Sequence, residues 1–248
     1  MQTVVFDIDG TLSFDGRQIN EEIVAAIQAL ERAGHRVIFA SARPIRDLLP
    51  IVPEFRQNEL IGANGALLAQ RGVVRTRSPF AAADLALVIQ LIQTTDLDYI
   101  ADGSWDYAAR VRSAQPILAQ VDPGQLAHRI SLADLDPVSK VILLNLAPPL
   151  RRRLMTELRD QTALTVVAHT DEGNLDLTAA GIDKATALET LGVTDYVAFG
   201  NDQNDRQLLA GARSGIWVRS KPTLAVPAGC TICEPTVKSV AAAIRHLI

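Results

Sequence analysis

Short apolar runs alternate with amphipathic helical patterns over the first third of the chain. Residues 4–8 and 36–40 are largely apolar runs of the kind that form buried strands of a parallel sheet. A helix is predicted between them, starting after an N-cap at Asn20 and ending at Gly34. A third strand is predicted at residues 60–62, followed by a small hairpin. This alternation is typical of a parallel sheet with helices on its faces.

The pattern changes near residue 79 and returns near residue 182. The stretch between them mixes helical and strand patterns in no regular order, with predicted helices at 81–94 and 150–161 and predicted strands near 99–100, 105–111, 138–146 and 164–168. Further strands are predicted at 196–199 and 215–218. The sequence therefore predicts an α/β fold: a Rossmann-like, doubly wound parallel sheet core (residues 1–79 and 180–248) with an inserted α/β domain (residues 80–179).

Composition is that of an ordinary globular protein and gives no general attraction for polyanions. Hydrophobic residues make up 48%, charged residues 21%, and the formal net charge is -4. We therefore expect no nucleic-acid and no membrane binding. The longest apolar stretch is too short to cross a membrane, and the first residues lack the basic start of a signal peptide, so a cytoplasmic location is expected. Nothing in the sequence indicates the oligomeric state.

Two cysteines, Cys230 and Cys233, form a C-x-x-C pattern late in the chain. This pattern occurs in halves of zinc sites and in redox pairs. Here the sequence holds no second pair, His246 stands alone, and the strand-then-helix context of a redox motif is missing. We therefore predict two structural thiols in a late loop or strand.

Two aspartates, Asp7 and Asp9, close the first predicted strand. Side chains two apart on a strand share a face, so both carboxylates are expected at its carboxyl end, where ligands bind to open α/β sheets. Two carboxylates about 4 Å apart repel by about 4 kcal/mol. A hard divalent cation such as Mg²⁺ removes this cost. The alternative is an Asp-rich turn without a ligand.

Polar residues also end two other predicted strands. Ser41 follows the second strand, the acidic run 201–205 follows the strand at 196–199, and Lys184 opens a helix shortly before that strand. In a parallel sheet these strand ends lie at one edge. Together they are suited to phosphoryl transfer, in which a carboxylate attacks phosphorus while a lysine, a hydroxyl and a cation neutralise the phosphoryl oxygens.

These motifs resemble those of the haloacid dehalogenase superfamily, specifically its Cof-type (subclass IIB) sugar-phosphatase-like branch. Residues 7–11 (DIDGT) resemble motif one, in which the first Asp is the nucleophile and the second the general acid/base. Ser41 resembles the motif-two hydroxyl residue and Lys184 the motif-three lysine. Residues 200–205 (GNDQND) resemble the acidic motif four, and the turn at 64–66 is typical of this branch.

The resemblance implies a cap, a cofactor and a set of site residues. The inserted domain would be an α/β cap of the subclass IIB type that closes over the catalytic edge. Mg²⁺ would be held by Asp7, the backbone carbonyl of Asp9, Asn201 and Asp205. The residues implied around the phosphate are Ser41, Ala42, Arg43, Asn64, Gly65, Lys184 and Asn204. The partner would be a small phosphate ester such as a sugar phosphate.

One position departs from the family pattern, because motif four often has Asp where Asn201 stands. Its amide oxygen is still a metal ligand, but one negative charge is missing, so metal affinity is the property affected. The neighbouring Asp202 is expected to face the other way.

Several candidates also have a structural interpretation. Ser41 fits a hydroxyl-capped turn, Asp205 a helix N-cap, and Lys184 a solvated first turn. Arg43 fits either a substrate contact or a pair with an acid. In the inserted domain four positions alternate at strand spacing and fit either contacts to the substrate or, as we expect, ordinary surface and core: Trp105, Tyr107, Arg110 and Arg112. Asp176 is expected to be structural.

The predicted activity is Mg²⁺-dependent hydrolysis of a small phosphate monoester through an aspartyl phosphate. Two alternatives remain. A phosphomutase of the phosphomannomutase type would transfer the phosphoryl group with a bisphosphate activator. A non-catalytic sugar-phosphate binder would keep the pocket without turnover, although such a protein has no need for the acid/base Asp9.

Overall fold

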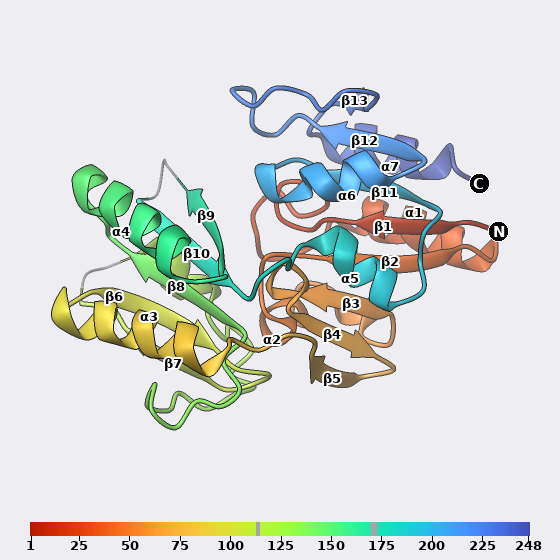
Figure 1. Ribbon diagram of the computed structural model, residues 1–248. Helices are drawn as coiled ribbons and strands as arrows, with labels where there is room; N and C mark the ends of the chain where they lie inside the picture. The colour runs from red at the N-terminus through yellow and green to blue at the C-terminus, as the bar shows by residue number, and fades with distance from the viewer. Residues whose placement is uncertain (113–114, 170–172) are drawn as a thin grey trace.

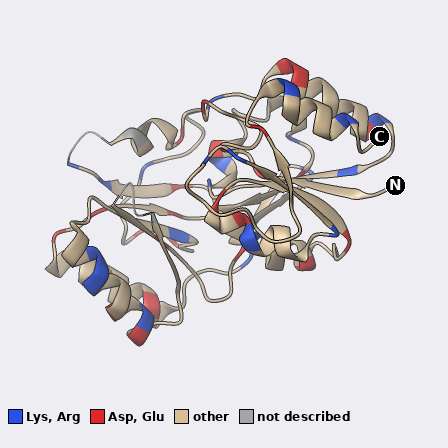
Figure 2. Ribbon diagram, turned by 90° about the horizontal axis from the view of Figure 1, so that it is seen from above, with Lys and Arg blue, Asp and Glu red and all other residues tan. Residues whose placement is uncertain are grey.

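The computed structural model describes residues 1–112, 115–169 and 173–248, and within these ranges the strands form two separate sheets (Figure 1). Eight strands from the two ends of the chain make one sheet, and five strands from its middle make the other. Seen from above in Figure 2, the two sheets lie side by side as two lobes. We call them the core unit and the inserted unit (residues 80–178).

The sheet of the core unit is built from β1 (Thr3–Phe6), β2 (Arg36–Ala40), β3 (Glu59–Gly62), β4 (Leu67–Gln70), β5 (Val73–Thr76), β11 (Tyr196–Gly200), β12 (Ser214–Val218) and β13 (Thr231–Cys233). Its order is β13-β12-β11-β1-β2-β3-β4-β5. Strands β13 to β3 run parallel, and β4 and β5 form an antiparallel hairpin at one edge. The first strand of the chain is thus central, and its carboxyl end lies between those of β2 and β11.

Helices cover both faces of this sheet: α1 (Glu21–Arg32), α2 (Ile45–Leu48), α5 (Lys184–Thr190), α6 (Arg206–Gly211) and α7 (Val237–Arg245). Alternate side chains of β1 point to opposite faces. Val4 and Phe6 pack in the cluster that α1 and α7 cover, whereas Val5 packs in the cluster that α5 and α6 cover. Because both faces of the inner parallel strands β1, β2 and β11 are buried, these strands read as nearly continuous apolar runs.

The inserted unit contains an antiparallel sheet of β6 (Asp98–Asp102), β7 (Tyr107–Arg110), β8 (Lys140–Leu144), β9 (Thr165–His169) and β10 (Asn174–Thr178), with helices α3 (Ala82–Thr94) and α4 (Pro148–Gln161). The strand order is β7-β6-β8-β10-β9. Both helices pack on one face, against Ala101, Val141 and Leu143 (Figure 1). Ile100 and Ile142 lie on the other face, which is turned toward the core unit.

The predicted α/β class with a parallel core sheet is confirmed, and two details of the prediction are wrong. The first strand ends at Phe6 instead of residue 8, because Leu12 and Ser13 donate backbone hydrogen bonds to the Ile8 carbonyl and turn the chain. Strand β10 was not predicted, since its polar ends and Asp176 mask a short alternating pattern. Cys230 and Cys233 are free thiols, and Cys233 ends β13.

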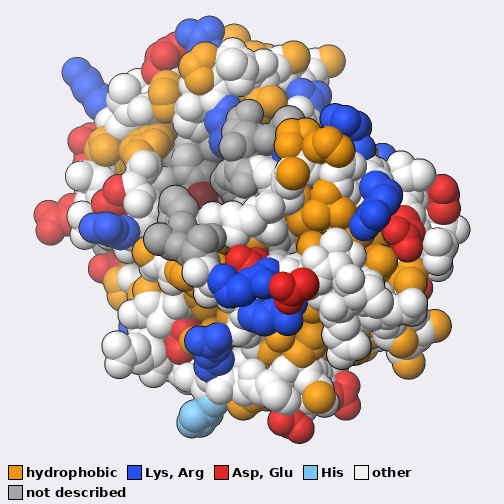
Figure 3. All heavy atoms as spheres, turned by 90° about the vertical axis from the view of Figure 1, so that its left-hand side faces the viewer, with side chains coloured by type: hydrophobic (Ala, Val, Ile, Leu, Met, Phe, Trp, Pro, Cys, Tyr) orange, Lys and Arg blue, Asp and Glu red, His pale blue; other side chains and the backbone are white. Residues whose placement is uncertain are grey.

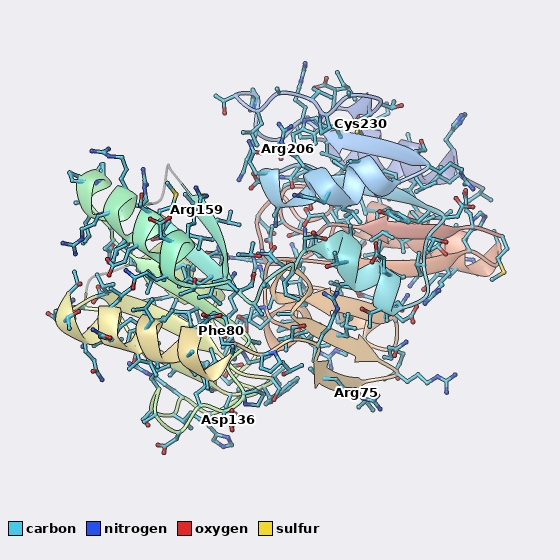
Figure 4. The ribbon with its side chains drawn as sticks, in the orientation of Figure 1. Arg75, Phe80, Asp136, Arg159, Arg206 and Cys230 are labelled. Carbon is cyan, nitrogen blue, oxygen red and sulfur yellow. The ribbon has the colours of Figure 1, made fainter. Side chains whose placement is uncertain are left out.

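The two units join through short links near residues 79 and 179. Phe80, labelled in Figure 4, is buried in the cluster of the inserted unit, and its N–H donates to the Val138 carbonyl. Ala179 at the second link packs in the cluster of the core unit. On the face of the inserted unit seen in Figure 3, apolar side chains are intermixed with basic and acidic ones. Within the described residues, no helix combines the length and apolarity needed to span a membrane.

Candidate active site

Three charged side chains from distant parts of the chain meet beneath the carboxyl end of the core sheet. Lys184 Nζ lies 2.6 Å from Asp7 Oδ1 and 2.6 Å from Asp205 Oδ1. All three residues are buried, and neither Lys184 nor Asp205 has any exposed surface. The structure therefore brings together three of the predicted site residues, and it excludes the alternative of a solvated Lys184.

The environment of Asp7 opposes its ionisation. Burial, followed by the charge of Asp205, raises the pKa of Asp7 to about 7, although Lys184 and the Thr11 hydroxyl act in the opposite direction. Two carboxylates, those of Asp7 and Asp205, share the single positive charge of Lys184, so together the three groups carry a net negative charge when all are ionised. Such a site favours the binding of a further cation.

Lys184 keeps its charge despite complete burial. Burial alone disfavours the ammonium form, but Asp205 and Asp7 outweigh it and raise the pKa of Lys184 above its usual value. The residue is the first of α5, where Asp183 is the N-cap and accepts a hydrogen bond from the Thr186 N–H. This cap fixes the start of the helix and so directs the lysine at the aspartates.

Within the described residues, the Asp9 side chain makes its contacts with Arg43 and not with this buried triad. The guanidinium donates from Nε to Asp9 Oδ2 at 2.8 Å and from Nη2 to Asp9 Oδ1 at 2.5 Å, and Nη2 also binds the Gly16 carbonyl. The Asp9 side chain is 40% exposed, whereas Arg43 is buried. Of the two roles predicted for Arg43, the structure shows the pair with an acid; a substrate contact stays a prediction.

Thr11 links motif one to motif four, a role that sequence reasoning did not assign. Its hydroxyl lies 2.7 Å from Asp7 Oδ2 and 3.2 Å from Asn201 Oδ1. Gly10 is required beside it, because it adopts φ +79° and a Cβ there would come within 2.2 Å of Asn201 Nδ2. The G-T pair that ends motif one therefore lets Asn201 approach Asp7.

Asp205 occupies the N-cap position of α6, as its structural interpretation predicts, but its side chain makes no capping hydrogen bond to that helix. Its Oδ2 accepts hydrogen bonds from the backbone N–H groups of Asn201 and Asp202, at 2.9 and 3.1 Å. The cap of the 3-10 turn Gln203–Asp205 is Asp202, which also pairs with Lys221. The carboxylate of Asp205 thus holds the loop of motif four and Lys184 at the same time.

The residues predicted to bind phosphate have contacts of their own near the cluster of Asp7, Lys184 and Asp205. Ser41 is buried, and its hydroxyl accepts a hydrogen bond from the Arg43 N–H, as a hydroxyl-capped turn requires. The Asn64 side-chain oxygen accepts from Asn204 Nδ2 at 2.9 Å. Gly65 has φ +109°, and a Cβ there would come within 2.3 Å of the Asp183 carbonyl oxygen. Gly65 therefore has a packing role, namely the close approach of this turn to the start of α5.

The residues predicted to hold Mg²⁺ form a set of oxygen donors. Asp7 Oδ2 and Asn201 Oδ1 both face the Thr11 hydroxyl, so these two oxygens converge on one point. Asp205 Oδ1 accepts one hydrogen bond, from Lys184, and retains a second lone pair, whereas Oδ2 already accepts two from the backbone. Among the described residues, no three His, Cys, Asp or Glu side chains form a metal cluster. The set is thus two carboxylates and an amide, hard ligands that suit Mg²⁺.

A cavity of about 490 Å³ lies between the two units above Asp9. The core unit contributes Arg43 and Asn201 to its lining, and the inserted unit contributes Lys140 and Asp176. Lys140 Nζ lies 2.7 Å from Asp176 Oδ2 and donates to the Ala42 carbonyl of the core unit at 3.0 Å. Asp176, expected to be structural, therefore lies at the cavity.

A second charged cluster joins the two units beside the cavity, and sequence reasoning missed it. Arg46, with 1% of its surface exposed, binds Asp47 of the core unit and Asp102 of the inserted unit. Its Nη1 also donates to the Trp105 carbonyl, and its guanidinium stacks on the Tyr107 ring. Burial raises the pKa of Asp102 to about 6 despite the attraction of Arg46. Only tertiary contacts reveal this cluster, because Arg46 lies outside every motif.

Comparison with known proteins gives a consistent result. A model of the haloacid dehalogenase-like hydrolases matches residues 4–242. A curated relative, the 5-amino-6-(5-phospho-D-ribitylamino)uracil phosphatase of Escherichia coli, is 25% identical over 225 residues, which are 86% of this chain and 83% of that protein.

Solved structures share the fold over the whole chain. A haloacid dehalogenase-like hydrolase from Bacillus subtilis has a TM-score of 0.81 at 18% identity, with 100% of each chain covered. One from Bacteroides thetaiotaomicron has a TM-score of 0.80 at 21% identity, covering 100% of this chain and 99% of the other. A subclass IIB sugar phosphatase has a TM-score of 0.79 at 17% identity, with the same coverage.

Proposed function

Because this chain belongs to the haloacid dehalogenase-like hydrolase family, we propose that it is a Mg²⁺-dependent phosphatase that hydrolyses a small phosphate monoester through an aspartyl phosphate. The observation that carries the proposal is the contact of Lys184 Nζ with both Asp7 and Asp205, next to a cavity that Asp9 lines. The phosphatase name of the Escherichia coli relative supports the reaction class. Sugar phosphates and similar metabolites are the proposed substrates.

In the proposed mechanism Asp7 is the nucleophile and Asp9 the general acid/base. The Asp7 carboxylate attacks phosphorus, and protonated Asp9 gives its proton to the leaving oxygen. Asp9, now a carboxylate, then takes a proton from the water that attacks the aspartyl phosphate. Arg43 binds both oxygens of Asp9, which orients the carboxylate form used in this second step.

The remaining residues neutralise and orient the phosphoryl group. Lys184 provides a fixed positive charge beside Asp7, and the Ser41 hydroxyl has a proton to donate to a phosphoryl oxygen. Asp7, the backbone carbonyl of Asp9, Asn201 and Asp205 would hold Mg²⁺. When bound, the ion offsets the negative charge of the phosphoryl oxygens and of the two aspartates.

We further propose that the inserted unit acts as a cap. Its open sheet face and the catalytic edge of the core unit line the same cavity. Closure would exclude water during the first half-reaction and supply contacts to the leaving group.

The two alternatives differ from hydrolysis in measurable ways. A phosphomutase would need a bisphosphate activator and would not release inorganic phosphate steadily from a sugar monophosphate. A non-catalytic binder would release none. The paired Asp9 and Arg43 favour catalysis, because a binder has no use for an oriented acid/base.

Replacing Asp7 by Asn tests the nucleophile. We expect Asp7→Asn to lower phosphate release from p-nitrophenyl phosphate by at least about a thousandfold, since an amide does not form the covalent intermediate. Lys184 keeps its partner Asp205, so the circular dichroism spectrum and unfolding midpoint should stay close to those of the wild type. Asp195→Asn, which changes an exposed carboxylate, is the matched control. Near-normal turnover by Asp7→Asn would refute the assignment.

Removal of divalent ions tests the cofactor. Dialysis against excess EDTA should abolish phosphate release, because the two buried aspartates then lose the cation that offsets their charge and that of the substrate. Adding Mg²⁺ back should restore the rate, whereas equal ionic strength from NaCl should not. Undiminished activity in EDTA would contradict the proposed role of the metal.

A further inference from the structure

The cavity between the units carries an excess of acidic side chains. Of the described residues in its lining, six are aspartates and three are basic. The aspartates are Asp9, Asp15, Asp47, Asp102, Asp176 and Asp202. The phosphoryl group brings further negative charge to the base of this cavity. An anionic leaving group therefore enters a site that is already short of cations.

Each basic side chain of the lining already has a carboxylate partner. Arg43 binds Asp9, Lys221 pairs with Asp202, and Lys140 lies 2.7 Å from Asp176. Arg46, just behind the lining, is shared between two other aspartates. Within the described residues of this wall, no cation is left over for a second phosphate or a carboxylate of the substrate.

The sheet of the inserted unit presents a mixed wall to this cavity. Ile100, Ile142 and Asp176 are cross-strand neighbours, and Lys140 is one step along the same face of β8. On this face two apolar side chains thus lie beside the Lys140–Asp176 pair, and Asp102 stands opposite Lys140 on β6. Hydroxyl and amide groups pair with Lys140 and Asp176 without adding charge, while the carbon skeleton of a ligand packs on the isoleucines.

The position of the Lys140–Asp176 pair is fixed from both units. Both residues are buried, and Lys140 also donates to the Ala42 carbonyl in the loop of the core unit that follows Ser41. A buried ion pair contributes little stability over apolar residues of the same size. The presence of this ion pair is therefore better explained by its position in the cavity lining than by a contribution to the packing of the inserted unit.

We propose that the substrate has an uncharged, hydrogen-bonding leaving group, and that Lys140 and Asp176 are the residues that select it and exclude esters with a second anionic group. The inference rests on the proposed function, because it takes the phosphoryl group to lie at Asp7. A second anionic group of the substrate would lie within a few ångströms of the aspartates in the cavity lining and would be repelled by them. At the effective dielectric of such sites, this repulsion is large enough for at least about tenfold discrimination between esters with and without that group.

Pairs of esters that differ in one anionic group test the inference. They are glycerol 3-phosphate with 3-phosphoglycerate, glucose 6-phosphate with 6-phosphogluconate, and fructose 6-phosphate with fructose 1,6-bisphosphate. We expect the wild-type enzyme with Mg²⁺ to show at least about tenfold higher kcat/KM for the uncharged leaving group in each pair. Equal or reversed values would overturn the inference.

Binding separates this inference from the proposed function. The dissociation constants of the same esters, measured calorimetrically on Asp7→Asn, should differ in the same direction whether or not the wild type releases phosphate. Selective binding without phosphate release would support the inference and refute the phosphatase. Phosphate release without selectivity between the paired esters would support the phosphatase and refute the inference.

A variant identifies the selecting residues. Asp176→Asn removes the carboxylate that pairs with Lys140, so the preference for uncharged leaving groups should fall at least about tenfold through a lower KM for the anionic esters. A purely structural role of Asp176 would weaken both members of each pair equally. Asp195→Asn removes the same charge far from the cavity and should leave the ratio unchanged. If Asp176→Asn does not fold, Lys140→Met should raise KM for uncharged esters; an unaltered KM would overturn the assignment.

Discussion

At the residue scale, the site depends on close backbone approaches as much as on its charged groups. Gly10 and Gly65 both have positive φ, and a Cβ on either would collide, in one case with the Asn201 side chain and in the other with the Asp183 carbonyl. A backbone atom has less room to shift than the end of a side chain. Gly65 therefore controls how closely its turn approaches Lys184.

Gly65→Ala should accordingly cost more than a glycine substitution in open space. We expect a loss of about 2–5 kcal/mol in the free energy of unfolding, from left-handed strain plus the backbone collision. Urea denaturation measures it. Gly181→Ala is the matched control, because Gly181 also has positive φ but a Cβ there would contact nothing, so about 1–2 kcal/mol is expected. Equal losses for the two variants would show that the contact with Asp183 is unimportant.

At the scale of elements, the contact between the two units is a charged one. The short helix α2 places Arg46 against strand β6, where its guanidinium donates a hydrogen bond to the Asp102 carboxylate. The neighbouring Asp47 accepts a hydrogen bond from the Asp122 N–H of the inserted unit. Arg46, Asp47 and Asp102 are all buried, so each of these charges is stabilised by the opposite charges beside it and not by water. Such a cluster defines the relative orientation of the two elements more than it stabilises them.

Removing the central cation of this cluster should be strongly destabilising. Arg46→Met leaves Asp47 and Asp102 buried without their partner, and we expect about 3–5 kcal/mol lower unfolding free energy. Arg213→Met breaks an exposed ion pair with Asp195 and should change stability by less than about 1 kcal/mol. Urea unfolding of both variants gives the comparison. A loss for Arg46→Met no larger than that for Arg213→Met would mean that the aspartates find other partners.

At the scale of the whole molecule, the two units have separate hydrophobic clusters. The clusters on the two faces of the core sheet contain no residue between 80 and 178, and the main cluster of the inserted unit lies wholly between Phe80 and Leu177. Every strand of the core sheet also lies outside the insertion. The core unit therefore contains all the contacts of a doubly wound domain.

Replacing residues 80–178 by a flexible Gly/Ser linker should leave a folded core unit. We expect a cooperative thermal transition by circular dichroism, because the parallel sheet and both helical layers are retained. Phosphate release from small esters should fall at least about tenfold, since water is no longer excluded and the leaving group loses its contacts. A non-cooperative or aggregated product would argue against two units. Full activity would argue against the role of the inserted unit as a cap.

Much of this arrangement was predictable from local sequence. The buried strands, the helix cap at Asn20 and the interruption of the core follow from the period of apolar residues and from capping chemistry, which act over a few residues. The convergence of Asp7, Lys184 and Asp205 was predictable because parallel strands share one carboxyl edge. Strand β10 was missed because five residues with polar ends give too short a pattern.

The sequence by itself determined the fold class, the order of the units and which polar residues follow the carboxyl ends of the core strands, because these depend on periodicity and on signals between near neighbours. Tertiary structure alone decided the partners. That Arg43 pairs with Asp9, that Thr11 joins Asp7 to Asn201, and that Arg46 and Lys140 connect the units are contacts across many residues of chain. Their energies depend on burial and on distance in space, which one-dimensional patterns do not record.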